Sequence, residues 1–387
     1  MRKSWFMMVS LAVLMVLSAC TNGGAAPTVT PSAAAPAYPP PGQTAYPAVQ
    51  GDTPPAPTAA SSGEAQTLTV MTHDSFTASE GVIRQFEQAN NVKITFLQSG
   101  DAGSAVNRAI LSKDSPLADV LYGVDNTFLS RALEAGLFEP YESPALADIA
   151  SEYKLDPSNR ALPVDYGDVC INYDKAYFAE KNLAVPQSLE DLAKPEYKGL
   201  LVVENPATSS PGLAFLLATI AQFGEDGYID YWTSLQKNGV VVVNDWEAAY
   251  YTNFSGSSGR GPQPMVVSYG SSPAAEVVFA QTPPAEAPTA SIVGPNTCFR
   301  QVEFVGILKG TQKMELARKF VDFMLSVPFQ EDMPLQMFVF PVNKNAKLPE
   351  VYTQNVQIPD QPATLDYETI AKNRDAWIKA WTAAVLK

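Results

Sequence analysis

Two kinds of hydrophobic pattern alternate along residues 68–125. Short runs rich in β-branched residues predict strands, and apolar residues spaced three or four apart predict helices between them. The strands are expected at residues 68–72, 92–97 and 118–122. This alternation indicates an α/β fold with a parallel sheet that is covered by helices on both faces.

Ligands of such sheets bind at the carboxyl ends of the strands. The loops at residues 73–76, 101–104 and 125–126 all leave strand ends, so we expect them to form one wall of a cleft.

A similar pattern returns in the second half of the chain. Strands are predicted at residues 200–203, 240–243, 265–268 and 299–308, with a buried helix at 213–223. The chain crosses between the two halves twice, at about residues 166–173 and 296–304. Two crossings between two lobes predict a hinged clamshell, with lobe 1 at 67–168, lobe 2 at 169–297 and a return to lobe 1 with C-terminal helices at 298–387.

Composition narrows the function. The 387 residues are 46% hydrophobic and 17% charged, as in soluble globular proteins, and the net charge is −14. Nucleic acid is therefore not an expected partner, because phosphates need clustered cations. The acidity suits a cationic ligand or simply favours solubility. A single histidine, His73, excludes catalysis by histidine pairs and metal sites that need several histidines, and no cofactor is predicted.

The N-terminus reads as an export signal over residues 1–19. Two basic residues precede an apolar run at 5–17, which is too short for a stable membrane span. The run ends in Leu-Ser-Ala-Cys, which resembles a lipobox and predicts lipid on Cys20; a plain secretory signal is the alternative. Residues 20–66 are rich in Ala, Pro and Thr and predict a disordered tether. The folded part is thus expected outside the cytoplasm, anchored to the outer face of the cytoplasmic membrane.

Six segments, in this order along the chain, resemble the periplasmic thiamine-binding proteins of ABC importers. They are residues 72–76, 123–126, 208–213, 245–250, 268–273 and 338–342. The resemblance covers nearly all of residues 68–387. It implies capture of thiamine, thiamine monophosphate or thiamine diphosphate between two lobes, without chemistry on the ligand. It also implies delivery to a permease that works with a cytoplasmic ATPase.

The resemblance and the loop positions together give a candidate ligand site. Aromatic faces suit the cationic thiazolium, carboxylates suit the amino group, and helix N-termini with hydroxyls suit a phosphate. The candidates are Asp74, Ser75, Asp101, Ala102, Asp125, Ser209, Ser210, Trp246, Tyr250, Tyr269, Ser272 and Phe338. Ordinary structural roles remain open, namely core packing for Trp246, N-capping for the two serines at 209 and 210, and loop capping for the aspartates.

The chain departs from the relatives' aromatic pattern at three positions. His73 replaces a tyrosine, Ala275 replaces an aromatic residue and Phe338 replaces a tryptophan. These changes bear on which form of the ligand is bound.

Cys170 and Cys298 lie on the two predicted crossings. If Cys20 carries lipid, an even pair remains in an oxidising compartment, so we expect a disulfide; two buried thiols are the alternative. A free Cys170 beside Asp165 or Glu303 would instead suit a thiaminase-like enzyme. A third hypothesis is capture of ferric iron, or another small cationic solute, with His73 and tyrosines as ligands.

Overall fold

The computed structural model describes residues 65–258 and 260–386. The predictions for the export signal, for Cys20 and for nearly all of the tether lie outside the described residues. The first strand begins at Gln66, one residue before the predicted start of lobe 1.

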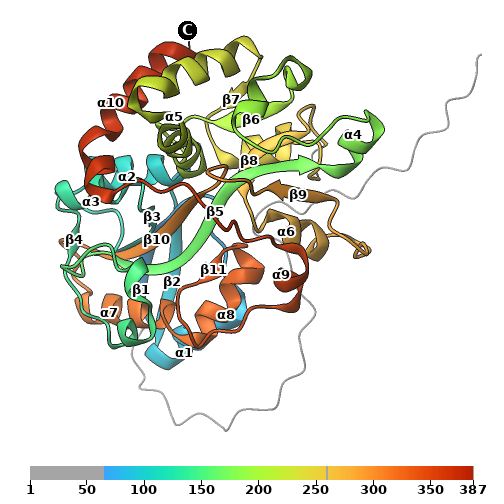
Figure 1. The fold of residues 1–387 in the computed structure, drawn as a ribbon. Helices are drawn as coiled ribbons and strands as arrows, with labels where there is room; N and C mark the ends of the chain where they lie inside the picture. Colours follow the sequence, from blue (N-terminus) through green and yellow to red (C-terminus); the bar gives the residue numbers. More distant parts are fainter. Residues whose placement is uncertain (1–64, 259, 387) are drawn as a thin grey trace, which may run out of the picture. The chain divides into compact units, whose positions relative to one another are not determined.

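Eleven strands form a mixed sheet in the described part of the chain, with the order β2-β1-β3-β10-β5-β8-β6-β7 (Figure 1). Strand β4 pairs with β10, and β9 and β11 pair with β5. The strands are β1 Gln66–Thr72, β2 Val92–Gln98, β3 Val120–Asp125, β4 Phe138–Glu139, β5 Leu162–Asp174, β6 Leu201–Glu204, β7 Val241–Val243, β8 Met265–Tyr269, β9 Thr289–Ile292, β10 Phe299–Leu308 and β11 Phe340–Pro341.

Helices follow most strands. They are α1 Glu80–Asn90, α2 Ala102–Leu111, α3 Leu129–Glu134, α4 Lys175–Glu180, α5 Ser210–Lys237, α6 Ser272–Val278, α7 Met314–Met324, α8 Val327–Gln336, α9 Glu350–Asn355 and α10 Tyr367–Val385. A π-helix spans Ala248–Asn253, and short 3-10 helices span Pro144–Asp148, Ser151–Tyr153, Glu190–Ala193 and Pro195–Tyr197. Within residues 65–258 and 260–386, no helix combines the length and the apolar character that a membrane crossing requires.

Strands β1, β2 and β3 are parallel and form the first lobe, as the alternating pattern predicts. Their side chains alternate between two hydrophobic clusters. Val70 packs in the cluster with α1 and α7, whereas the next residue, Met71, packs in the cluster with α2. Successive side chains of a strand point to opposite faces of a sheet, so helices cover this part of the sheet on both sides.

Strands β6, β7 and β8 are parallel and form the second lobe. The helix that follows β6 is much longer than the predicted 213–223. Its first part ends near Gly224, whose φ of 74° is non-helical, and a second helical stretch continues to Lys237. Glycine adopts this backbone conformation without steric cost. The kink therefore falls at Gly224, directly after the end of the predicted helix at residue 223.

The long antiparallel strands β5 and β10 join the lobes. The first half of β5 pairs with β10, and its second half pairs with β8 and β9 (Figure 1). These strands occupy the two predicted crossings. They also make the sheet mixed, whereas the alternating pattern predicts only parallel strands.

The C-terminal helix α10 packs against α5 (Figure 1). Trp381 is fully buried, and its ring meets that of Trp232 edge to face with centroids 5.4 Å apart. Helix α7 returns to the first lobe, where Phe320 and Val321 join the cluster formed by β1 and α1. The position of α7 agrees with the predicted return of the chain to the first lobe, whereas α10 lies against a helix of the second lobe.

Candidate functional site

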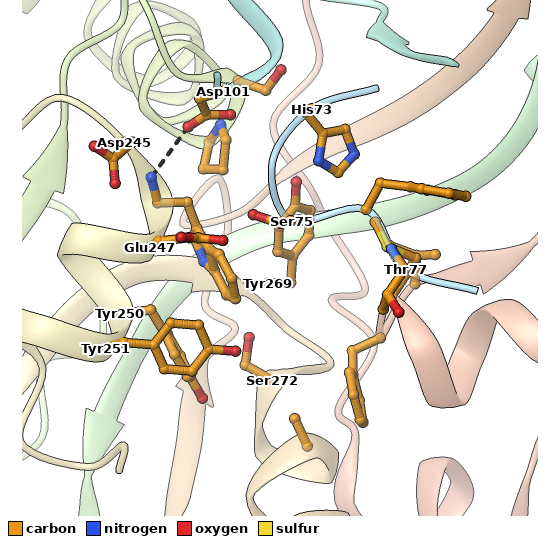
Figure 2. A pocket seen from close by; sticks show the side chains of 18 of the residues that line it. His73, Ser75, Thr77, Asp101, Asp245, Glu247, Tyr250, Tyr251, Tyr269 and Ser272 are labelled. Atoms are coloured by element: carbon orange, nitrogen blue, oxygen red, sulfur yellow. Dashed lines mark hydrogen bonds between the residues drawn. The ribbon is translucent and has the colours of Figure 1, made fainter. Parts of the chain in front are cut away.

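A cavity of about 680 Å³ lies beside the ends of strands from both lobes. The first lobe contributes the segment after β1 and the start of α2, and the second lobe contributes the starts of α5 and α6 and the π-helix (Figure 2). Residues 336–339, just before β11, complete the wall. The wall therefore contains the strand-end loops that the sequence assigns to a cleft, except residues 125–126.

Nine of the twelve candidate residues line this cavity: Ser75, Asp101, Ala102, Ser210, Trp246, Tyr250, Tyr269, Ser272 and Phe338. The other three are not among the lining residues. The Asp74 carboxylate accepts a hydrogen bond from the backbone N–H of Gly100 at 2.8 Å. The Asp125 carboxylate accepts bonds from Thr127 and Gln301, and Ser209 is the fully buried N-cap residue of α5. Asp125 ends strand β3, whereas the sequence places it in a loop.

The π-helix and the tryptophan just before it supply an aromatic wall. The Trp246 and Tyr250 rings stack with centroids 5.0 Å apart at an angle of 18°, and Tyr251 stands nearly perpendicular to Trp246. The indole N–H donates to Ser268 at 2.9 Å, and the Ser268 and Ser272 hydroxyls share a hydrogen bond. The indole orientation is thus held by β8 and α6, so its face is preorganised for a flat ligand.

Tyr269 and Phe338 are fixed by close contacts. Gly167 gives Tyr269 room, because a Cβ at this position would lie 2.8 Å from the tyrosine ring. Phe338 has a φ of 54°, which is unusual for a bulky residue, and its carbonyl accepts a hydrogen bond from the Ser271 hydroxyl. Its ring packs against Phe279 with centroids 5.2 Å apart. Such backbone conformations recur at binding sites, where surrounding contacts hold them in place.

Asp101 connects the lobes. Its carboxylate caps α2 by accepting from Ala102 N–H at 2.7 Å, and it accepts from Trp246 N–H of the second lobe at 3.1 Å (dashed line in Figure 2). Burial raises the pKa of Asp101 to about 6, although these bonds and the nearby Ser209 hydroxyl oppose the rise. The carboxylate occupies the N-terminus of α2, the position at which the sequence suggests a phosphate.

The cavity is acidic. Five carboxyl side chains line it, from Asp101, Asp245, Glu247, Glu276 and Glu303, and no lysine or arginine is among its described lining residues. His73, across the cavity from Tyr250 and Tyr251 in Figure 2, is neutral at pH 7, because burial lowers its pKa to about 4. Carboxylates beside an aromatic face suit an organic cation that carries hydrogen-bond donors.

Comparison with known proteins assigns a family. Residues 115–366 match the family of bacterial extracellular solute-binding proteins. The chain belongs to this family. It is 30% identical to the thiamine-binding periplasmic protein of Brucella suis biovar 1 (strain 1330) over 329 residues, which cover 82% of this chain and 92% of the relative. It is 31% identical to the protein of the same name from Escherichia coli (strain K12) over 324 residues, which cover 82% and 93%.

Solved structures agree with this family. A periplasmic thiamin binding protein matches this solute-binding protein with a TM-score of 0.73 and 28% identity, covering 82% of this chain and 96% of that chain. A ferric binding protein from Campylobacter jejuni shares the fold, with a TM-score of 0.65 at 20% identity. The predicted α/β fold of the periplasmic-binding-protein type is confirmed. The relatives are extracytoplasmic solute-binding proteins, so the chain is a binding protein and not an enzyme.

The two hinge cysteines of this solute-binding protein form a disulfide. Cys170 of β5 and Cys298, just before β10, have Cα atoms 4.2 Å apart. Neither sulfur is therefore a free nucleophile, which is what a thiaminase-like site at Cys170 would need. Within the described residues, no group of three or more His, Cys, Asp or Glu side chains is placed to hold a metal ion.

Sequence reasoning omitted several lining residues from the candidate site. Asp245, Glu247 and Tyr251 lie in or beside a segment that the family resemblance marks, so their position was a usable signal. His73 and Ala275, two of the three departures from the relatives, also line the cavity. The sequence names Glu303 only as a neighbour of a possible catalytic cysteine, yet an acidic residue inside an apolar strand is itself a signal of an unusual site.

Proposed function

We propose that this chain captures thiamine in the cavity and delivers it to the permease of an ABC importer. One observation carries the proposal: the stacked pair Trp246–Tyr250 faces a cavity lined by carboxyl groups without lysine or arginine in the described wall. Thiamine offers the matching chemistry, a permanent cation and a flat amino-bearing ring. The names of the two relatives at 30% and 31% identity support the same ligand.

We expect the cavity to favour thiamine over its phosphate esters. A phosphate would enter a wall of five carboxyl groups, and the Asp101 carboxylate already occupies the N-terminus of α2. The N-terminus of α5, with Ser210 on the cavity wall, remains as a weaker anion position. We expect affinity to fall in the order thiamine, monophosphate, diphosphate.

Calorimetric titration of the full chain, purified in mild detergent, tests the ligand. Thiamine is expected to bind saturably, and Trp246→Ala to weaken binding about 10- to 100-fold, because cation–π and stacking contacts contribute up to about 2 kcal/mol or more. Tyr177→Ala is the matched control, since this half-buried tyrosine of α4 lies outside the cavity wall. An absence of heat with every thiamine compound, with binding of ferric citrate instead, would overturn the ligand assignment.

The anchor is the second part of the proposal. Lipid on Cys20 would hold the binding domain at the outer face of the cytoplasmic membrane, beside the permease. Cys20→Ser is expected to move the protein from the membrane fraction to the soluble extracytoplasmic fraction, and mass spectrometry of the N-terminal peptide reads the lipid directly. Membrane retention of Cys20→Ser would refute the anchor and leave the ligand assignment unaffected.

A further inference from the structure

Two carboxyl groups meet one phenol at the floor of the cavity. Glu303 of β10 and Asp165 of β5 lie directly opposite each other on neighbouring antiparallel strands. The Tyr122 hydroxyl of β3 lies 2.7 Å from an Asp165 oxygen and 3.1 Å from a Glu303 oxygen. Asp165 and Tyr122 are fully buried, whereas Glu303 is 5% exposed and lines the cavity. Of the three groups, only Glu303 can contact a ligand.

Counting hydrogens assigns a proton to Glu303. A phenol carries one hydrogen, so Tyr122 can donate to only one of the two carboxyl groups. The shorter contact is with Asp165, which makes Asp165 the acceptor. Two carboxyl groups and one phenol in mutual contact therefore need a second proton, and the direct hydrogen bond between Glu303 and Asp165 places it on Glu303, because that bond raises the pKa of Glu303 and lowers the pKa of Asp165. The geometry is therefore a cluster in which Tyr122 donates to Asp165 and Glu303 holds the second proton beside both groups.

The surroundings of Glu303 support this proton. Burial and the neighbouring Asp165 raise the pKa of Glu303 well above its usual value, and Asp125 of β3 acts in the same direction. His73, after β1, has its Nε2 atom 3.6 Å from the second Glu303 oxygen, but it is uncharged at neutral pH. Tyr269 of β8 is a neutral phenol, because burial raises its pKa well above 10. No cation among these described neighbours favours an ionised Glu303.

We propose that Glu303 recognises the positive charge of the bound ligand and releases its proton to solvent when the ligand enters. This inference rests on the proposed capture of thiamine and adds the residue that neutralises the cation and the proton linkage of binding. An organic cation beside Glu303 favours the carboxylate, as an opposite charge within about 4–6 Å does in general. Only the Glu303 O–H bond breaks: its electron pair stays on the carboxylate, and the proton passes to buffer.

The second consequence is a pH dependence of affinity. When the empty site holds a proton that the occupied site does not, the affinity for thiamine rises with pH. The limit for one proton is a tenfold change in Kd per pH unit. A cavity whose carboxyl groups are all ionised before binding would show no such slope.

Calorimetry in two buffers tests the proton release. The full chain is titrated with thiamine at pH 7 in phosphate and in Tris, whose ionisation heats differ, and the difference gives the protons released per ligand. About one proton is expected for the unmodified chain. Glu303→Gln, which keeps a hydrogen-bond donor at this position, is expected to bind at least tenfold more weakly and to release none. Asp332→Asn is the matched control, because it removes another carboxyl group whose pKa is raised by burial but which lies outside the cavity wall, and it should leave the release in place.

The outcomes separate this inference from the proposed function. Thiamine binding with the same heat in both buffers would overturn the role of Glu303 and leave thiamine capture intact. Equal proton release by Glu303→Gln and the unmodified chain would also overturn it. An absence of thiamine binding in the unmodified chain would instead refute the proposed function. If Glu303→Gln does not fold, the Kd of the unmodified chain for thiamine is measured from pH 6 to 8 instead. A Kd that does not change with pH contradicts the inference.

Discussion

Gly103 offers a direct test of whether the two lobes must approach each other for binding. It is the second residue of α2, and a Cβ at this position would lie 2.8 Å from the backbone oxygen of Thr208 in the second lobe. It would also lie 2.7 Å from the ring of Phe128, which belongs to the first lobe. The overlap with Thr208 arises only when the two lobes are in contact. The overlap with Phe128 lies within the first lobe and is present in every arrangement of the lobes.

The size of the effect follows from these contacts. Both distances are well inside the ~3.5 Å at which non-bonded atoms begin to attract, and overpacking of this kind costs about 1–3 kcal/mol. The Phe128 ring can turn, but the Thr208 carbonyl belongs to the backbone just before α5 and has little freedom. If the lobes close on the ligand, Gly103→Ala destabilises the closed form and raises the Kd for thiamine about 5- to 150-fold.

The control is Gly81→Ala. Gly81 is the second residue of α1, and nothing lies within 4 Å of a Cβ placed there. Both variants gain the same helix propensity of up to about 1 kcal/mol, so this contribution cancels in the comparison. Isothermal calorimetry gives Kd, and urea unfolding gives the free energy of unfolding for each variant.

Two results would refute the reasoning. If Gly103→Ala lowers the free energy of unfolding but leaves Kd unchanged, the contact with Thr208 is a permanent part of the fold and not a consequence of closure. If Gly81→Ala weakens binding equally, the effect arises from helix propensity and not from the contact between lobes.

Three further predictions address the histidine, the core and the hinge. His73 is the chain's one histidine, so its NMR signal can be followed alone in protein without a histidine tag, and it should titrate near pH 4. The free energy of unfolding should fall as pH drops from about 6.5 towards 4, because over this range the unfolded chain binds a proton that the folded chain does not. A midpoint near 6.5 would contradict the burial argument. Trp381→Ala should lower the free energy of unfolding in urea by about 3–5 kcal/mol, because it empties a fully buried site; a loss below about 1 kcal/mol would show that α10 contributes little. The double substitution Cys170→Ala and Cys298→Ala should cost roughly 2–4 kcal/mol in the same assay, since the disulfide closes 128 residues, and an unchanged midpoint would contradict this.

Much of the fold could be predicted from local pattern. The strand predicted at 299–308 coincides with β10, and α7 packs on the first lobe, to which the chain is predicted to return. The antiparallel direction of β5 and β10 was not predicted, because strand direction depends on long-range pairing that no local period records. The length of α5 was missed at Gly224, where a non-helical residue interrupts one element without ending it.

The aromatic part of the candidate site was also accessible from sequence. Trp246, Tyr250, Tyr269 and Phe338 were selected because they match the family's segments, and all four line the cavity. Asp125 was expected at a strand-end loop, but β3 extends through it, and its carboxylate caps the turn that leads to α3. Local pattern locates the end of a strand only to within a few residues. At a cavity wall, an error of this size is enough to mistake a buried residue for one that lines the cavity.

The carboxyl pair beneath the cavity marks the limit of sequence reasoning. Tyr122 is separated along the chain from Asp165 by 43 residues and from Glu303 by 181. A lone acid in an apolar strand signals an unusual site, but its meaning depends on its neighbour. Beside a lysine, Glu303 would be a permanent anion that merely attracts cations. Beside a phenol already bonded to Asp165, it holds a proton that an arriving cation can displace. The difference between a fixed charge and a proton-linked site therefore lies in the pairing of β3, β5 and β10.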